Sequence, residues 1–136
     1  MLIACLGFPP EQIGEGFRKD VEVRQVTMGE VRELRNQYPL QLMVLATEDV
    51  EITELEKLAY AVSGLIIVQR SAEPAICAVT RAQGTWIEIV AVAIGQYNEA
   101  IRTRREMQAT GDGRSGLGTE IGFFERQLQL LRSFLA

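Results

Sequence analysis

The polar side chains best placed to do chemistry follow the apolar runs of the sequence. Glu48 and Asp49 come after the run at 40–46, and Ser71 comes after the run at 65–68. If these runs are strands of an open parallel sheet, their carboxyl ends meet at one edge, where such sheets bind ligands. The sequence therefore contains one candidate site for a small ligand or nucleotide, made of Gly7, Thr47, Glu48, Asp49 and Ser71.

A metal site at this edge is not predicted. Mg²⁺ is held by carboxylates and other oxygen ligands, so a further acid would have to come from the first loop, 7–11. That loop offers only Glu11. Two adjacent acids in a loop are also typical of a solvated turn, which is the alternative interpretation of Glu48 and Asp49.

The residue types that most enzymes need are missing. The chain has no histidine, which excludes histidine-activated nucleophiles and most zinc and non-haem iron sites. Cys5 and Cys77 lie in apolar segments without metal-ligand spacing, as is typical of reduced core cysteines. The glycines of the loop at 109–118 have the spacing of a phosphate-binding loop, but Thr119 stands where that loop needs lysine. We therefore expect a protein that is not an enzyme and uses no cofactor or metal.

The composition is that of a globular protein and argues against binding to nucleic acid. Apolar residues make up 47% of the chain and charged residues 24%, both ordinary fractions. The formal net charge is −4, whereas contacts to phosphate groups need clustered cations. No signal peptide and no apolar run of membrane-spanning length is apparent. We expect no membrane partner and a cytoplasmic location.

The order of apolar runs and helical stripes predicts an α/β fold. Strand-like and helical segments alternate along the chain, which predicts a three-layer, doubly wound parallel sheet of about five strands. The predicted strands are 2–6, 21–27, 40–46, 65–68 and 86–92, and the predicted helices are 10–20, 27–38, 53–62, 74–83, 96–107 and 119–136.

The segment from 86 to 107 has two interpretations. Trp86, Ile87, Ile89, Val90 and Val92 are aromatic or β-branched, which favours a strand followed by a helix. The same segment also carries apolar residues at helical spacing. If it is one helix, that strand is lost and the last two helices form a hairpin.

Over residues 1–107 the order and lengths of these elements resemble the receiver domain of two-component response regulators. In that family, acidic residues after the first strand bind Mg²⁺, and an aspartate that ends the third strand accepts the phosphoryl group. This chain has Gly7 and Phe8 at the first place and Thr47 at the second. Ser71 matches a family serine or threonine, but Val92 and Ala93 stand where the family has Lys-Pro. The resemblance implies a pseudo-receiver that keeps the fold, has lost phosphotransfer and acts by dimerisation or docking.

The last segment, 119–136, reads as an amphipathic helix with a broad apolar face. We divide the chain into a domain at 1–108, a glycine-rich loop at 109–118 and this helix. An α/β sandwich would be complete without the helix, so we expect its face to be an interaction surface. The main functional hypothesis is a non-catalytic regulatory or scaffold domain that forms a homodimer or docks another protein. The predicted interface residues are Ile121, Phe124, Leu128, Leu131 and Leu135.

Overall fold

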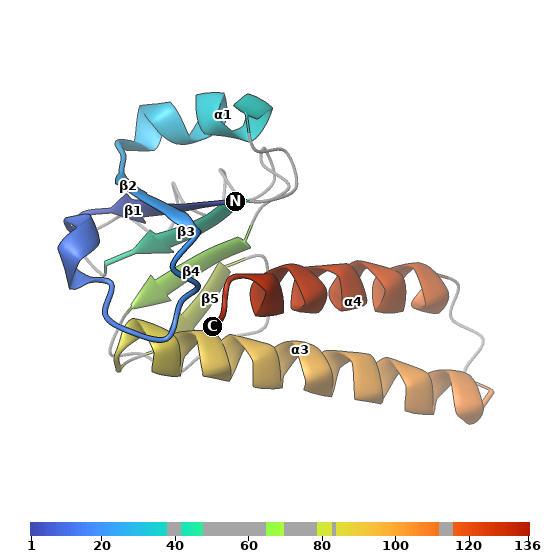
Figure 1. The fold of residues 1–136 in the computed structure, drawn as a ribbon. Coiled ribbons are helices and arrows are strands. Elements are labelled where there is room, and N and C mark those ends of the chain that lie inside the picture. The colour runs from blue at the N-terminus through green and yellow to red at the C-terminus, as the bar shows by residue number, and fades with distance from the viewer. Residues whose placement is uncertain (38–41, 48–64, 70–78, 83, 112–115) are drawn as a thin grey trace.

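The computed structural model describes residues 1–37, 42–47, 65–69, 79–82, 84–111 and 116–136. The strands in these residues form one parallel sheet with the order β2-β1-β3-β4-β5 (Figure 1). Their bounds are β1 Leu2–Leu6, β2 Glu22–Gln25, β3 Leu42–Ala46, β4 Leu65–Gln69 and β5 Val79–Ala82. The protein is therefore of the α/β class with a parallel sheet, as the alternation of elements predicted.

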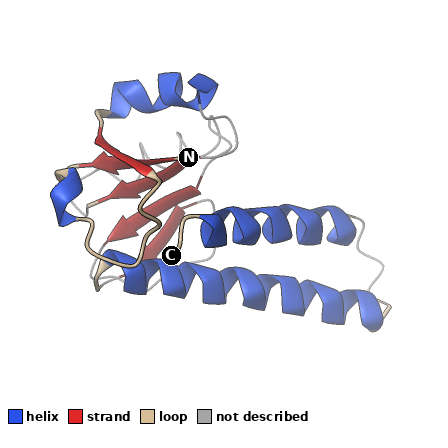
Figure 2. Ribbon diagram, viewed as in Figure 1, coloured by secondary structure: helices blue, strands red, loops and turns tan. Residues whose placement is uncertain are grey.

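The side chains of strands β1 and β3 belong alternately to two separate hydrophobic clusters, one on each face of the sheet. Every residue of β1 and β3 is buried, because continuous apolar strands can be covered on both faces. Ile3, Cys5, Met43 and Leu45 belong to one cluster with the C-terminal helices. Their alternating neighbours belong to a second cluster with α1, Met28–Gln37. Figures 1 and 2 accordingly show α1 on one side of the sheet and α3 and α4 on the other.

The connection from β1 to β2 lacks the helix predicted at 10–20. It contains a single 3-10 turn, η1 (Pro10–Gln12), and is irregular from there to β2. Gly14 and Gly16 have φ angles of +81° and +105°, a region that glycine enters at no steric cost. These two glycines therefore stop the helix.

Residues 86–107 belong to one helix, so the strand predicted at 86–92 is wrong. The helix α3 spans Trp86–Ala109, and its N-cap Thr85 accepts a hydrogen bond from the backbone N–H of Glu88. The outermost strand is β5 instead, inside the segment 74–83 that had been predicted as a helix. The helix predicted at 53–62 lies outside the described residues.

The last helix, α4, spans Leu117–Ser133 and packs antiparallel to α3 (Figure 1). Arg104 of α3 links the two helices. Its Nε donates to Oε2 of Glu120 at 2.8 Å, and its guanidinium lies 4.6 Å from the ring centroid of Phe124. The N-cap of α4 is Gly116, so the helix begins before the segment predicted at 119–136.

The residues predicted as an interface at the end of the chain pack within the chain instead. Ile121, Leu128 and Leu131 are buried in the cluster that contains Ile3 and Cys5 of β1, and Phe124 and Leu135 pack against it while partly exposed. The physical reason is the missing first helix, because α4 covers the face of the sheet that this helix would have covered. Among the described residues, Phe123 is the one large apolar side chain that is exposed, at 46%.

No helix in the described parts of the chain combines the length and apolarity needed to cross a membrane.

Candidate ligand-binding site

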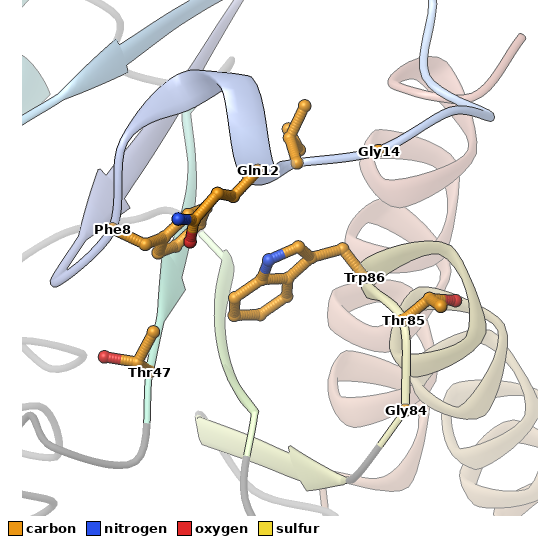
Figure 3. Close-up of a pocket in the computed structure, with 8 residues that line it drawn as sticks. Phe8, Gln12, Gly14, Thr47, Gly84, Thr85 and Trp86 are labelled. Carbon is orange, nitrogen blue, oxygen red and sulfur yellow. The ribbon is translucent and has the colours of Figure 1, made fainter.

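A cleft of about 390 Å³ lies at the carboxyl ends of the strands, within the usual range for small-molecule sites. It is bounded by the chain after β1, by the end of β3 and by the start of α3 (Figure 3). The lining residues are Phe8, Gln12, Ile13, Gly14, Thr47, Gly84, Thr85 and Trp86. This is the edge of the sheet where the sequence predicted a ligand site.

Two stacked aromatic rings form the floor of the cleft. The rings of Phe8 and Trp86 have centroids 4.8 Å apart and planes inclined by 20°. The two residues are only 3% and 4% exposed, so most of each ring is packed into the protein. Figure 3 shows Phe8, Gln12 and Trp86 projecting into the same space, whereas the hydroxyl of Thr85 points away from it.

Thr47 places a hydroxyl group at the boundary between β1 and β3. Its backbone N–H donates to the carbonyl of Leu6 at 3.2 Å, which joins the carboxyl ends of the two strands. Its Oγ1 is buried and has no hydrogen-bond partner in the described structure. The direction of the strand order reverses between β1 and β3, and open α/β sheets bind ligands at such a switch point. A buried hydroxyl without a partner costs about 1–3 kcal/mol, and a ligand could remove that cost.

The first turn of α3 already holds a negative charge. Thr85 and Glu88 form a capping box, in which Thr85 Oγ1 accepts from the Glu88 N–H at 3.4 Å and donates to Glu88 Oε1 at 2.9 Å. The other carboxylate oxygen reaches Gly84, where an added Cβ would lie 2.9 Å from Oε2. The Glu88 carboxylate therefore lies beside two lining residues, Gly84 and Thr85.

The structure describes only part of the predicted ligand site. Thr47 is in the lining of the cleft, and Gly7, with a φ angle of +87°, directly precedes Phe8. Glu48, Asp49 and Ser71 lie outside the described residues. Gln12, Gly14 and Trp86 were not predicted as site residues, because their residue types favoured a helix at 10–20 and a strand at 86–92 that do not form. Gly84 lies between two predicted elements and was not predicted either. The spacing of Thr85 and Glu88 was the signal that could have placed Trp86 at a helix start.

The thiol of Cys5 in β1 is buried and protonated at neutral pH. Burial raises the pKa of the Cys5 thiol to about 11, and the negative charge of Glu11 adds to this effect. A protonated, buried thiol is a poor nucleophile. In the described part of the chain, no three His, Cys, Asp or Glu side chains are grouped so that they could hold a metal ion.

The fold and the cleft together define an α/β domain with a candidate ligand site at the carboxyl edge of its sheet. No protein-family model, curated protein or solved structure matches this chain.

Proposed function

We propose that this chain is a non-catalytic domain that binds a small molecule in the cleft and acts as a ligand-sensing module. The observation that carries the proposal is the unpartnered Thr47 hydroxyl, which is buried in the lining of a cleft at the β1–β3 switch point. This is the second of the two functions considered from the sequence. It now has the better support, because the apolar face of α4 packs within the same chain.

We also propose that the domain is of the doubly wound, flavodoxin-like type. The strand order β2-β1-β3-β4-β5 supports this arrangement, and it is compatible with the pseudo-receiver interpretation. Gly7, Phe8 and Thr47 occupy the places where a receiver needs acidic residues. The proposal therefore involves ligand binding without phosphotransfer.

Trp86 makes the binding test direct, because it is the single tryptophan of the chain and it lines the cleft. The 136-residue chain would be titrated with adenosine, guanosine, cytidine, uridine and their 5′-monophosphates while tryptophan fluorescence is recorded. We expect saturable changes for at least one compound and a matching rise in melting temperature, since a ligand stabilises the folded state that binds it. The absence of both responses at millimolar concentration for all eight compounds would contradict the proposal.

A second candidate function rests on the exposed ring of Phe123. The α3–α4 hairpin extends beyond the sheet in Figure 1, and Phe123 of α4 is 46% exposed. We propose that this part of the hairpin docks a second copy of the chain. Sedimentation would detect a dimer that Phe123→Glu converts to monomer. A wild-type protein that is monomeric at 100 μM or more would exclude this function and leave the ligand proposal untouched.

A further inference from the structure

The outer edge of β2 presents backbone hydrogen-bonding groups to a further strand. β2 is the last strand at its end of the sheet, where it pairs with β1 (Figure 1). The N–H of Glu22 donates to the carbonyl of Met1 at 3.2 Å, so the backbone groups of Glu22 and Arg24 point toward β1. Because these groups alternate in direction along a strand, those of Val23 and Gln25 point away from the sheet.

This edge of the sheet is accessible. The side chains of Glu22 and Arg24 are 46% and 41% exposed, and Gln25 is exposed as well. The chain is described without a gap from residue 1 to residue 37. No described residue forms a hydrogen bond with the outward-facing backbone groups of Val23 and Gln25. Such an edge is a template for pairing with another strand.

The order of charges along β2 fits a second copy of the same strand in the antiparallel orientation. If Val23 lies opposite Val23 of the other copy, the outward-facing groups of the two valines exchange a reciprocal pair of hydrogen bonds. The same register places Glu22 of each copy opposite Arg24 of the other. The Cα atoms of these flanking pairs would be only about 4.5 Å apart, and opposite charges across such a pair stabilise it. β2 also lacks proline, which often blocks an edge strand.

The two faces of β2 are compatible with this pairing. Val23 packs against the cluster on the face of α3 and α4, whereas Glu22 and Arg24 are in register with β1 residues on the face that α1 covers. A two-fold axis perpendicular to the sheet keeps each face on its own side. The two valines therefore meet on one face and the four charged side chains on the other. Within each copy Arg24 and Glu22 already form an ion pair at 2.6 Å, so the dimer joins two ion pairs into a ring of alternating charge.

We infer that two copies of this chain associate through antiparallel pairing of their β2 strands, which joins the two sheets into one continuous sheet. Such an interface is isologous, because the same surface of each copy is used. Four residues on each side make a small interface, so the dimer is weak and depends on concentration. This inference is independent of ligand binding in the cleft, and it uses a different surface from Phe123 of α4.

The test is sedimentation equilibrium of the 136-residue chain from about 5 to about 500 μM, with the charge reversals Glu22→Arg and Arg24→Glu. Each variant makes both cross-strand pairs like-charged, so dimerisation should weaken at least about tenfold. An equimolar mixture of the two variants restores opposite charges across the interface. It should therefore associate at least as tightly as the wild type. Circular dichroism would verify that both variants keep the fold, as expected for exposed side chains.

The matched control is Glu33→Arg, which makes the same change of charge at an exposed position of α1. This variant and Phe123→Glu should both dimerise like the wild type. A wild type that is monomeric throughout the range, or a mixture that stays monomeric, would overturn the inference. Equal weakening by Glu33→Arg and Glu22→Arg would do the same, since net charge would then govern association. A dimer that only Phe123→Glu disrupts would assign the interface to the α3–α4 hairpin instead. The fluorescence titration tests the ligand proposal separately from all of these outcomes.

Discussion

At the scale of single residues, removing the hydroxyl of Thr47 should lower ligand affinity without lowering the stability of the fold. Thr47→Val replaces an unpartnered buried hydroxyl with a methyl group of similar size. We expect the free energy of unfolding to stay the same or rise by up to about 1 kcal/mol, because an unsatisfied polar group is removed. The affinity for a compound that binds in the fluorescence titration should fall about fivefold or more, which corresponds to one lost hydrogen bond. Urea denaturation and calorimetry measure the two effects.

Thr103→Val is the control for this substitution, since Thr103 is exposed in the middle of α3. It should change neither the affinity nor, beyond about 0.5 kcal/mol, the stability. A loss of stability in Thr47→Val alone would mean that the hydroxyl already has a partner in the ligand-free protein, contrary to our description of the cleft.

Cys5 should make the stability of the protein fall at alkaline pH. Burial keeps the thiol protonated in the folded state, with a pKa of about 11 against an ordinary value of 9.0. The folded state therefore holds a proton that the unfolded state releases. The stabilisation is complete below pH 9 and is lost as the pH rises toward 11, with a total of about 2–3 kcal/mol.

Urea unfolding of the wild type and of Cys5→Ala between pH 8 and pH 11 would isolate this effect. Cys5→Ala lowers stability at every pH because it leaves a small cavity, but it removes the thiol titration. We expect the difference between the two proteins to shrink as the pH rises. Parallel curves would show that the thiol is not shifted.

At the scale of elements, residues 86–107 show where residue types alone fail to distinguish a strand from a helix, because this segment is helical throughout. Aromatic and β-branched residues from Trp86 to Val92 favour a strand as isolated residues, but propensity is weaker than packing. The capping box of Thr85 and Glu88 starts a helix here, and the apolar stripe continues through Tyr97 to Ile101. The strands β1, β3 and β4 were predictable because each contains a continuous run of apolar residues, which is typical of strands in a parallel sheet.

Only those residues of the candidate site that directly follow a clearly marked strand could be predicted from the sequence. Thr47 follows a strand that the sequence marks clearly, so its place at the edge of the sheet could be predicted. Trp86 and Gly84 join the cleft through the turn between β5 and α3, and β5 is short and carries no strong apolar pattern. Gln12 and Gly14 join it because η1 ends after one turn, a result of glycine conformations that residue types alone do not determine.

Because α4 packs against the core, substitutions of Phe134 and Phe123 should lower the free energy of unfolding by very different amounts. Phe134 is fully buried at the C-cap of α4, whereas Phe123 is 46% exposed. We expect Phe134→Ala to lower the free energy of unfolding by about 3–5 kcal/mol and Phe123→Ala to lower it by about 1 kcal/mol or less. Urea denaturation of both variants checks this. Equal effects would mean that α4 is not seated on the sheet as described.

At the scale of the whole molecule, the loop that follows η1 is hydrogen-bonded to the last residues of the chain. The N–H of Arg18 donates to the carbonyl of Phe134 at 2.9 Å, and the N–H of Ala136 donates to the carbonyl of Gly16 at 3.0 Å. These bonds join the loop after η1 to the end of α4. The loop also lines the cleft through Ile13 and Gly14 and approaches α3 at Ile87. The missing first helix is thus replaced by a contact between distant parts of the sequence, which no local pattern could predict.

Gly16 is the point where this contact is most restricted, and its neighbour Gly14 provides the matched control. Both have positive φ angles, but an added Cβ would lie 2.6 Å from Ile87 Cγ1 at Gly16 and would meet nothing within 4 Å at Gly14. Backbone strain should make Gly14→Ala cost about 1 kcal/mol, and the added overlap should raise the cost of Gly16→Ala to about 2–4 kcal/mol. Native-state hydrogen exchange should show faster exchange of the Arg18 and Ala136 amides in Gly16→Ala than in Gly14→Ala. If both variants exchange these amides at the wild-type rate, the loop and the end of α4 are not joined in solution.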